Sequence, residues 1–185
     1  MFIQTERTPN PATMKFLPGV PVMERGTANY TAQAEAAPSP LATGLFGVDG
    51  ITGIFLGSDF ITVTKSDDKD WDVMKPQILG AIMEHFQSGK AVIESEDAGA
   101  SEPADKDDGG AIGEQIKELI DTRVRPAVAQ DGGDIIYKGF EDGIVYLHMQ
   151  GACAGCPSST ATLKNGIENM LRHYIPEVTE VRAIE

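Results

Sequence analysis

Three segments of the chain repeat apolar residues at the spacing of one helix face. The apolar positions are Met74, Ile78, Ile82 and Phe86 in the first segment, Ile112, Ile116, Leu119, Ile120 and Val124 in the second, and Leu163, Ile167, Met170, Leu171 and Tyr174 in the third. This spacing predicts three amphipathic helices. Pro76 lies near the start of the first, where a missing N–H costs least, whereas Pro126 should kink or restart the second.

Shorter apolar runs between turn residues predict the strands. In the first half of the chain these runs are residues 2–8, 13–17, 51–56 and 60–64, and in the second half they are 135–140, 144–150 and 178–184. Pro9-Asn10-Pro11 separates the first two runs, and the turns at 57–59 and 141–143 predict hairpins. Ser39-Pro40 supplies a cap and a first-turn proline for a short helix to Phe46. The Ala-rich stretch 26–39 is expected to be a loop.

The acidic segment 95–110 divides the sequence. It contains six acidic residues, one lysine and no large apolar residue, so it cannot bury enough surface to offset its ordering entropy. We expect a flexible linker between two domains, residues 1–94 and 111–185. The predicted fold class is α+β, with two small α/β-sandwich-like domains, the second in the order α-β-β-α-β.

Charge and composition exclude some functions. The chain has 15 basic and 28 acidic residues, a net charge of −13, which argues against a nucleic-acid partner because such proteins carry a basic face. No apolar run approaches the length that crosses a bilayer, so no membrane partner is expected. Strand-like sequence follows Met1 directly, without a visible signal peptide. Two cysteines in one motif suit a reducing compartment.

Cys153 and Cys156 are the candidate site, because thiols three positions apart can bind one metal or cluster edge, or can close a disulfide. The predicted helix after Pro157 has its positive end here, which should favour thiolates. Three chemistries stay open on this pattern. A thioredoxin-like dithiol usually follows a βαβ unit, and zinc needs four ligands from a chain with two cysteines and three histidines. An iron–sulfur cluster usually needs four thiolates, and therefore two chains.

Two long stretches carry a family resemblance. Asp131-Gly-Gly-Asp134 and Gly151-Ala-Cys-Ala-Gly-Cys-Pro-Ser-Ser-Thr160, with Leu163 and Gly166-Ile-Glu168, closely resemble the C-terminal domain of the NifU-like (Nfu) proteins. The opening residues 2–19, Phe-Ile-Gln-Thr-Glu-Arg-Thr-Pro-Asn-Pro-Ala-Thr-Met-Lys-Phe-Leu-Pro-Gly, resemble the separate N-terminal domain of the same family. Together the two matches cover nearly everything except the linker.

The resemblance implies a scaffold or carrier without catalytic turnover. Such proteins bind a 4Fe–4S cluster between two subunits, as a homodimer, and transfer it to apo iron–sulfur proteins. The family's ligands correspond to Cys153 and Cys156, an upstream assembly scaffold is the expected donor, and a 2Fe–2S form is left open. The N-terminal domain is expected to recognise partners. The chain begins at this domain without an Arg-rich leader, which indicates a bacterial cytoplasmic protein, or a mitochondrial matrix protein if it is a processed eukaryotic form.

Other polar residues near the motif have simpler interpretations. Asp131 and Asp134 could form a carboxylate pair for catalysis or a hard metal, but a turn in which both glycines adopt positive φ is favoured. Arg123 and Arg125 are interpreted as a solvated helix face rather than as contacts to a partner or cluster.

Overall fold

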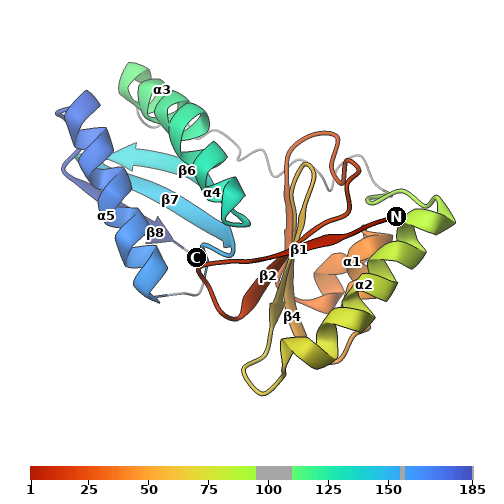
Figure 1. The fold of residues 1–185 in the computed structure, drawn as a ribbon. Coiled ribbons are helices and arrows are strands. Elements are labelled where there is room, and N and C mark those ends of the chain that lie inside the picture. Colours follow the sequence, from red (N-terminus) through yellow and green to blue (C-terminus); the bar gives the residue numbers. More distant parts are fainter. Residues whose placement is uncertain (95–109, 155–156, 185) are drawn as a thin grey trace. The chain divides into compact units, whose positions relative to one another are not determined.

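The computed structural model describes residues 1–94, 110–154 and 157–184. These residues form two compact units, 1–94 and 110–184, and each combines helices with a sheet (Figure 1). The predicted α+β class is therefore confirmed. The expected linker lies outside the described residues except for Gly110, which begins the first helix of the second unit.

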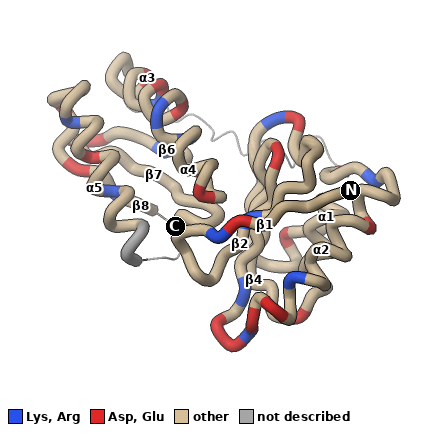
Figure 2. The backbone as a smooth tube through the Cα atoms, viewed as in Figure 1, with Lys and Arg blue, Asp and Glu red and all other residues tan. Residues whose placement is uncertain are grey.

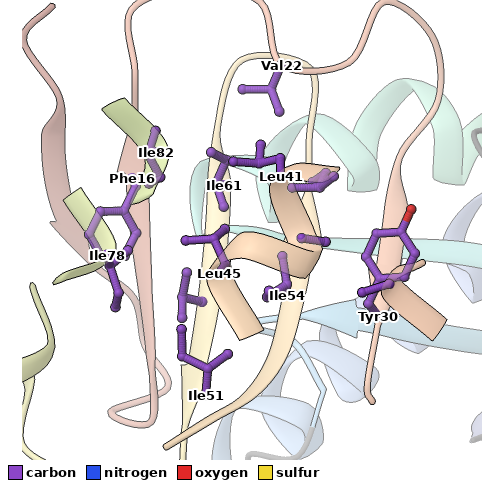
Figure 3. Packing of buried hydrophobic residues seen from close by; sticks show 14 of the residues in the cluster. Phe16, Val22, Tyr30, Leu41, Leu45, Ile51, Ile54, Ile61, Ile78 and Ile82 are labelled. Atoms are coloured by element: carbon purple, nitrogen blue, oxygen red, sulfur yellow. The ribbon is translucent and has the colours of Figure 1, made fainter. Parts of the chain in front are cut away.

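The first unit is a five-stranded antiparallel sheet with two helices. Its strands follow the order β1-β2-β5-β4-β3. The strands are β1 (Gln4–Arg7), β2 (Thr13–Leu17), β3 (Ala28–Tyr30), β4 (Ile51–Leu56) and β5 (Ile61–Lys65), and the helices are α1 (Pro40–Phe46) and α2 (Trp71–Ser88). Both helices pack on the same face of the sheet, where Phe16, Leu45 and Ile78 meet in the core (Figure 3).

Helix α1 begins where the sequence predicts, at a capped proline. The Ser39 hydroxyl accepts a hydrogen bond from the Ala42 N–H at 3.1 Å and donates one to the Val92 carbonyl at 2.6 Å. Pro40 occupies the first turn, where its missing N–H costs nothing. A single buried serine therefore fixes the helix start and ties it to the chain beyond α2.

The expected loop at residues 26–39 is wrong in part. It contains β3 and a 3₁₀ turn, η1 (Gln33–Ala36). Ala28 and Tyr30 point into the core, and Asn29 pairs with Phe55 of β4. Three residues are too short to show a strand period, and their pairing partner lies more than twenty positions further along the chain. This edge strand forms because β4 offers it a partner, and no local signal predicts it.

The second unit has the predicted order α-β-β-α-β. The order is α3 (Gly110–Leu119), η2 (Ile120–Val124), α4 (Arg125–Gln130), β6 (Gly133–Glu141), β7 (Ile144–Gly151), α5 (Pro157–Tyr174) and β8 (Glu180–Ile184). Strands β6 and β7 form an antiparallel hairpin, whereas β7 and β8 are parallel and are joined by α5. Val145, Leu147 and Met149 alternate along β7 and enter the core with residues of α3, α4 and α5.

The helical region 110–130 of the second unit is irregular just before Pro126, as the proline predicts. Residues Ile120–Val124 form one π-helical turn before α4, and Pro126 lies in the first turn of α4. Proline cannot donate a helical hydrogen bond, and its ring clashes with the carbonyl four residues earlier, which accounts for the irregular turn. The hairpin turn is also as expected, because Asp142 and Gly143 both have positive φ, 49° and 79°.

Tyr174 is not on the buried face predicted for it. Its side chain is 48% exposed, and the Arg123 guanidinium lies 5.1 Å from its ring centroid. Ile167 and Leu171 are buried, and the next core position four residues later is Ile175. The apolar spacing therefore continues to Ile175, one residue past the end of α5, and Tyr174 lies outside the hydrophobic core.

Charged residues are distributed over helices, strands and turns of both units (Figure 2). Of the helices that the structure describes, none is both long and apolar enough to span a bilayer.

Candidate functional site

Cys153 lies in the tight turn that follows β7. Gly151 ends the strand with a φ of 63°, and the Ala154 N–H donates to the Gly151 carbonyl at 3.1 Å. The Cys153 side chain is 7% exposed and packs at the edge of the core that contains Met149 and Ile167. Cys156, the other predicted ligand, lies outside the described residues, so the ligand pair stays a prediction.

The Asp131–Asp134 turn packs directly against the Cys153 turn. The Ala152 N–H donates to the Gly132 carbonyl at 3.2 Å. A Cβ atom on Gly133 would lie 2.5 Å from Cys153 Sγ, 3.0 Å from Cys153 N and 2.8 Å from the Gln150 carbonyl oxygen. Real Cβ atoms essentially never approach other atoms this closely, so the contact requires glycine at position 133.

The two glycines therefore have different roles. Gly132 has a φ of 81°, as the turn interpretation expects. Gly133 does not have positive φ, so the expectation that both glycines supply it is wrong for this residue. It begins β6 opposite Gly151, and its absent side chain leaves room for the cysteine.

Asp134 is a structural carboxylate bound to Arg125. Its side chain is 5% exposed and accepts two hydrogen bonds from Arg125, from Nε at 2.9 Å and from Nη2 at 2.8 Å. The Ile135 N–H donates a third at 2.8 Å. The hydrogen bonds that Arg125 donates to Asp134 raise the pKa of Arg125 above its ordinary value. Arg125 is therefore not the solvated residue expected from the sequence.

Burial dominates the electrostatics of Cys153. Burial, with smaller effects from the negative charges of Asp131 and Asp134, raises the pKa of the thiol to about 12. This opposes the expected effect of the helix end, which would lower the pKa. Cys153 is therefore a protonated thiol at neutral pH, and a metal ion that bound this sulfur would have to displace the proton.

Thr160 holds the Cys153 backbone from the first turn of α5. Its hydroxyl donates to the Cys153 carbonyl at 3.0 Å. The sequence interpretation gave this residue no role, although Thr160 ends the motif that carries the family resemblance. A hydroxyl seven residues after a cysteine predicts no such contact by itself.

Metal-binding side chains do not form a further cluster in the part of the chain that the structure describes. Nowhere in residues 1–94, 110–154 and 157–184 do three His, Cys, Asp or Glu side chains converge as a metal site. His148 lies on β7, with Nδ1 3.3 Å from the Ile184 carbonyl oxygen. Of the two cysteines predicted to bind the cluster, the structure describes Cys153.

The first unit contains a separate groove beside its edge strand. A cavity of about 530 Å³ lies between β1, the turn that follows it and the start of α2, with Arg7, Trp71 and Lys75 among its lining residues. The Trp71 Nε1–H donates to the Pro11 carbonyl at 3.1 Å and holds the two walls together.

Comparison with known proteins identifies the family. The profile described as "Scaffold protein Nfu/NifU N terminal" matches residues 3–89, and the profile described as "NifU-like domain" matches residues 116–182. The human protein named "NFU1 iron-sulfur cluster scaffold homolog, mitochondrial" is 51% identical over 185 residues, which is 100% of this chain and 72% of the human protein. The chain belongs to the Nfu/NifU-like family.

A plant protein and a solved structure are also similar to this chain. "NifU-like protein 4, mitochondrial" from Arabidopsis thaliana is 53% identical over 184 residues, covering 98% of this chain but 65% of the plant protein. The chain thus spans less than two thirds of the length of the plant relative and somewhat more than two thirds of the human one. A solution NMR structure of a NifU-like protein from Saccharomyces cerevisiae is 26% identical, with a TM-score of 0.47 over 52% of this chain and 87% of the yeast chain.

Proposed function

We propose that this chain is an iron–sulfur cluster scaffold and carrier, which binds a 4Fe–4S cluster between two copies through Cys153 and Cys156. The observation that carries the proposal is the packing of Cys153 against Gly133, a contact that leaves room for the cysteine and for no side chain at position 133. The name of the human relative describes it as an iron–sulfur cluster scaffold homolog.

Ligand number supports the dimer. A 4Fe–4S cluster usually takes four thiolates, and the chain has two cysteines. Two copies related by a two-fold axis would supply four. A cluster shared in this way can be approached by the thiolates of an apo-protein, so transfer proceeds by ligand exchange rather than by catalytic turnover. A 2Fe–2S cluster is the alternative cargo.

Partners follow from this role. Apo iron–sulfur proteins are the recipients, and an upstream assembly scaffold is the donor. The first unit supplies recognition, and the groove at Arg7, Trp71 and Lys75 is its candidate surface. The names of the relatives give a mitochondrial location, which favours the mitochondrial matrix for this chain and lends no support to the bacterial cytoplasm expected first.

A dithiol redox function is less well supported. Attack on a disulfide needs a thiolate, and burial, with the charges of Asp131 and Asp134, raises the pKa of the Cys153 thiol to about 12. The motif also follows the antiparallel hairpin of β6 and β7, whereas a thioredoxin-like dithiol usually follows a βαβ unit. Proton loss on binding iron, by contrast, is driven by the metal itself.

Single cysteine variants test the proposal. Cys153→Ser and Cys156→Ser should each abolish retention of a reconstituted cluster while the apo-protein stays folded, as judged by circular dichroism. Ala154→Ser is the matched control, since it adds a hydroxyl in the same turn and keeps both thiols. Cluster retention by both cysteine variants would reject these ligands.

A further inference from the structure

The loop between α4 and β6 is closed by one ion pair. Arg125 begins α4 and Asp134 follows Gly133 at the start of β6. Two parallel hydrogen bonds of 2.9 and 2.8 Å join the guanidinium to the carboxylate. This two-point geometry fixes orientation as well as distance. The loop between the two residues, which are nine positions apart in sequence, therefore cannot open without breaking both hydrogen bonds.

A second carboxylate holds the guanidinium from its own helical region. Arg125 Nη1 lies 3.3 Å from Asp121 Oδ1, one turn earlier in the π-helical segment. Arg125 thus bridges the irregular turn to the strand. Lysine could not do this, because its ammonium lacks the planar fork.

The closed loop is the surface against which Cys153 packs. Gly133, next to Asp134, faces Cys153 Sγ, and the Gly132 carbonyl accepts the hydrogen bond of Ala152, next to Cys153. A small shift of the loop would therefore move Gly133, the residue against which the Cys153 sulfur packs. The ion pair lies one residue away from that contact.

We infer that Arg125 and Asp134 are positioning residues, which hold the Asp131–Asp134 turn so that Cys153 keeps its geometry as a cluster ligand. The inference rests on the proposed function. Asp134 is buried, whereas the Arg125 side chain is 37% exposed. Stability alone does not require such a pair, since apolar residues often replace even a fully buried ion pair at no cost. Fixed orientation next to a ligand is what the charged pair adds. Partners of this kind around metal ligands typically change metal affinity by about 10–100-fold when they are lost.

The experiment compares cluster lifetime with apo stability. Wild type, R125Q, R125K and D134N are reconstituted anaerobically, and the half-life of the cluster absorbance is followed in excess chelator. The temperature is one at which every apo variant is folded. We expect half-lives at least about tenfold shorter for all three variants. R125K separates geometry from charge, because it keeps the charge and loses the fork. If D134N does not fold, R125K still tests whether the paired geometry prolongs the cluster lifetime.

Arg172→Gln is the matched control. Arg172 lies 3.3 Å from Glu168, whose carboxylate also accepts a backbone N–H, from Val181 at 3.2 Å. R172Q removes an arginine–carboxylate pair in the same unit. It should change the apo melting temperature little, because Arg172 is 51% exposed, and it should not shorten the cluster half-life. A wild-type half-life in R125Q and R125K, or an equal loss in R172Q, would overturn the positioning role alone. A wild type that binds no cluster would overturn the proposed function as well.

Discussion

Gly133 lies so close to Cys153 that a Cβ atom at position 133 would lie 2.5 Å from the cysteine sulfur. Twenty residues separate the two in sequence, yet each belongs to a turn packed against the other. The contact shows why the Gly-Gly turn and the cysteine turn occur together in one domain: the first is shaped to accommodate the second.

Gly133→Ala should therefore damage both the fold and the site. The added methyl group must displace the sulfur or the Gln150 carbonyl, and such overpacking typically costs about 1–3 kcal/mol. We expect a lower melting temperature of the apo-protein and less iron retained after reconstitution. Gly166→Ala is the control, because Gly166 is exposed on α5 and its Cβ would meet open space. It should preserve the iron content and stabilise the helix by up to about 1 kcal/mol. Equal iron content in the two variants would contradict the described contact.

Ser39→Ala should destabilise the first unit. It removes the acceptor for the Ala42 N–H and the donor to the Val92 carbonyl, and the loss of a helix cap costs about 1–2 kcal/mol. The chain's single tryptophan, Trp71, lies in this unit, so its fluorescence during urea unfolding reports on it. Ser58→Ala, in an exposed turn, should change stability by less than about 0.5 kcal/mol. Indistinguishable midpoints for the two variants would mean that the cap contributes little.

His85 should make the first unit less stable in mild acid. Its side chain is buried on α2, and burial, with a smaller effect from Lys90, lowers its pKa below the ordinary value of 6.5. The unfolded chain then takes up a proton that the folded chain does not, so stability present above pH 6.5 falls as the pH drops below it. Trp71 fluorescence should show the urea midpoint falling between about pH 7.5 and 5.5, and falling less in His85→Leu. The same fall in both proteins would exclude His85 as the cause.

Local signals in the sequence predicted most of the fold. The cap and proline at Ser39-Pro40 gave the bounds of α1, and Pro9-Asn10-Pro11 gave the start of β2 at Thr13. Strand β3 was missed because three residues show no period, and its pairing with β4 is a tertiary interaction. Tyr174 was placed on the buried face because the spacing does not reveal that the chain leaves the helix and buries Ile175 instead.

The sequence predicts candidate ligand residues but not their surroundings. Cys153 was proposed as a ligand from its spacing and context and stays a prediction. Its contact with Gly133, and the Arg125–Asp134 pair, join segments that only the folded chain brings together. The predicted shift of the Cys153 pKa, a lowering by the helix end, was wrong for the same reason. Helix position can be read from sequence, but the burial that outweighs it depends on packing around the thiol.

The most direct test of the central claim is the iron, sulfide and zinc content of the wild-type chain, measured with its oligomeric state before and after anaerobic reconstitution. Four irons shared by two chains predict about two irons and two sulfides per chain, no zinc, and a dimer that forms with the cluster. A colourless monomer after reconstitution, or a protein that carries zinc in place of iron, would contradict the account.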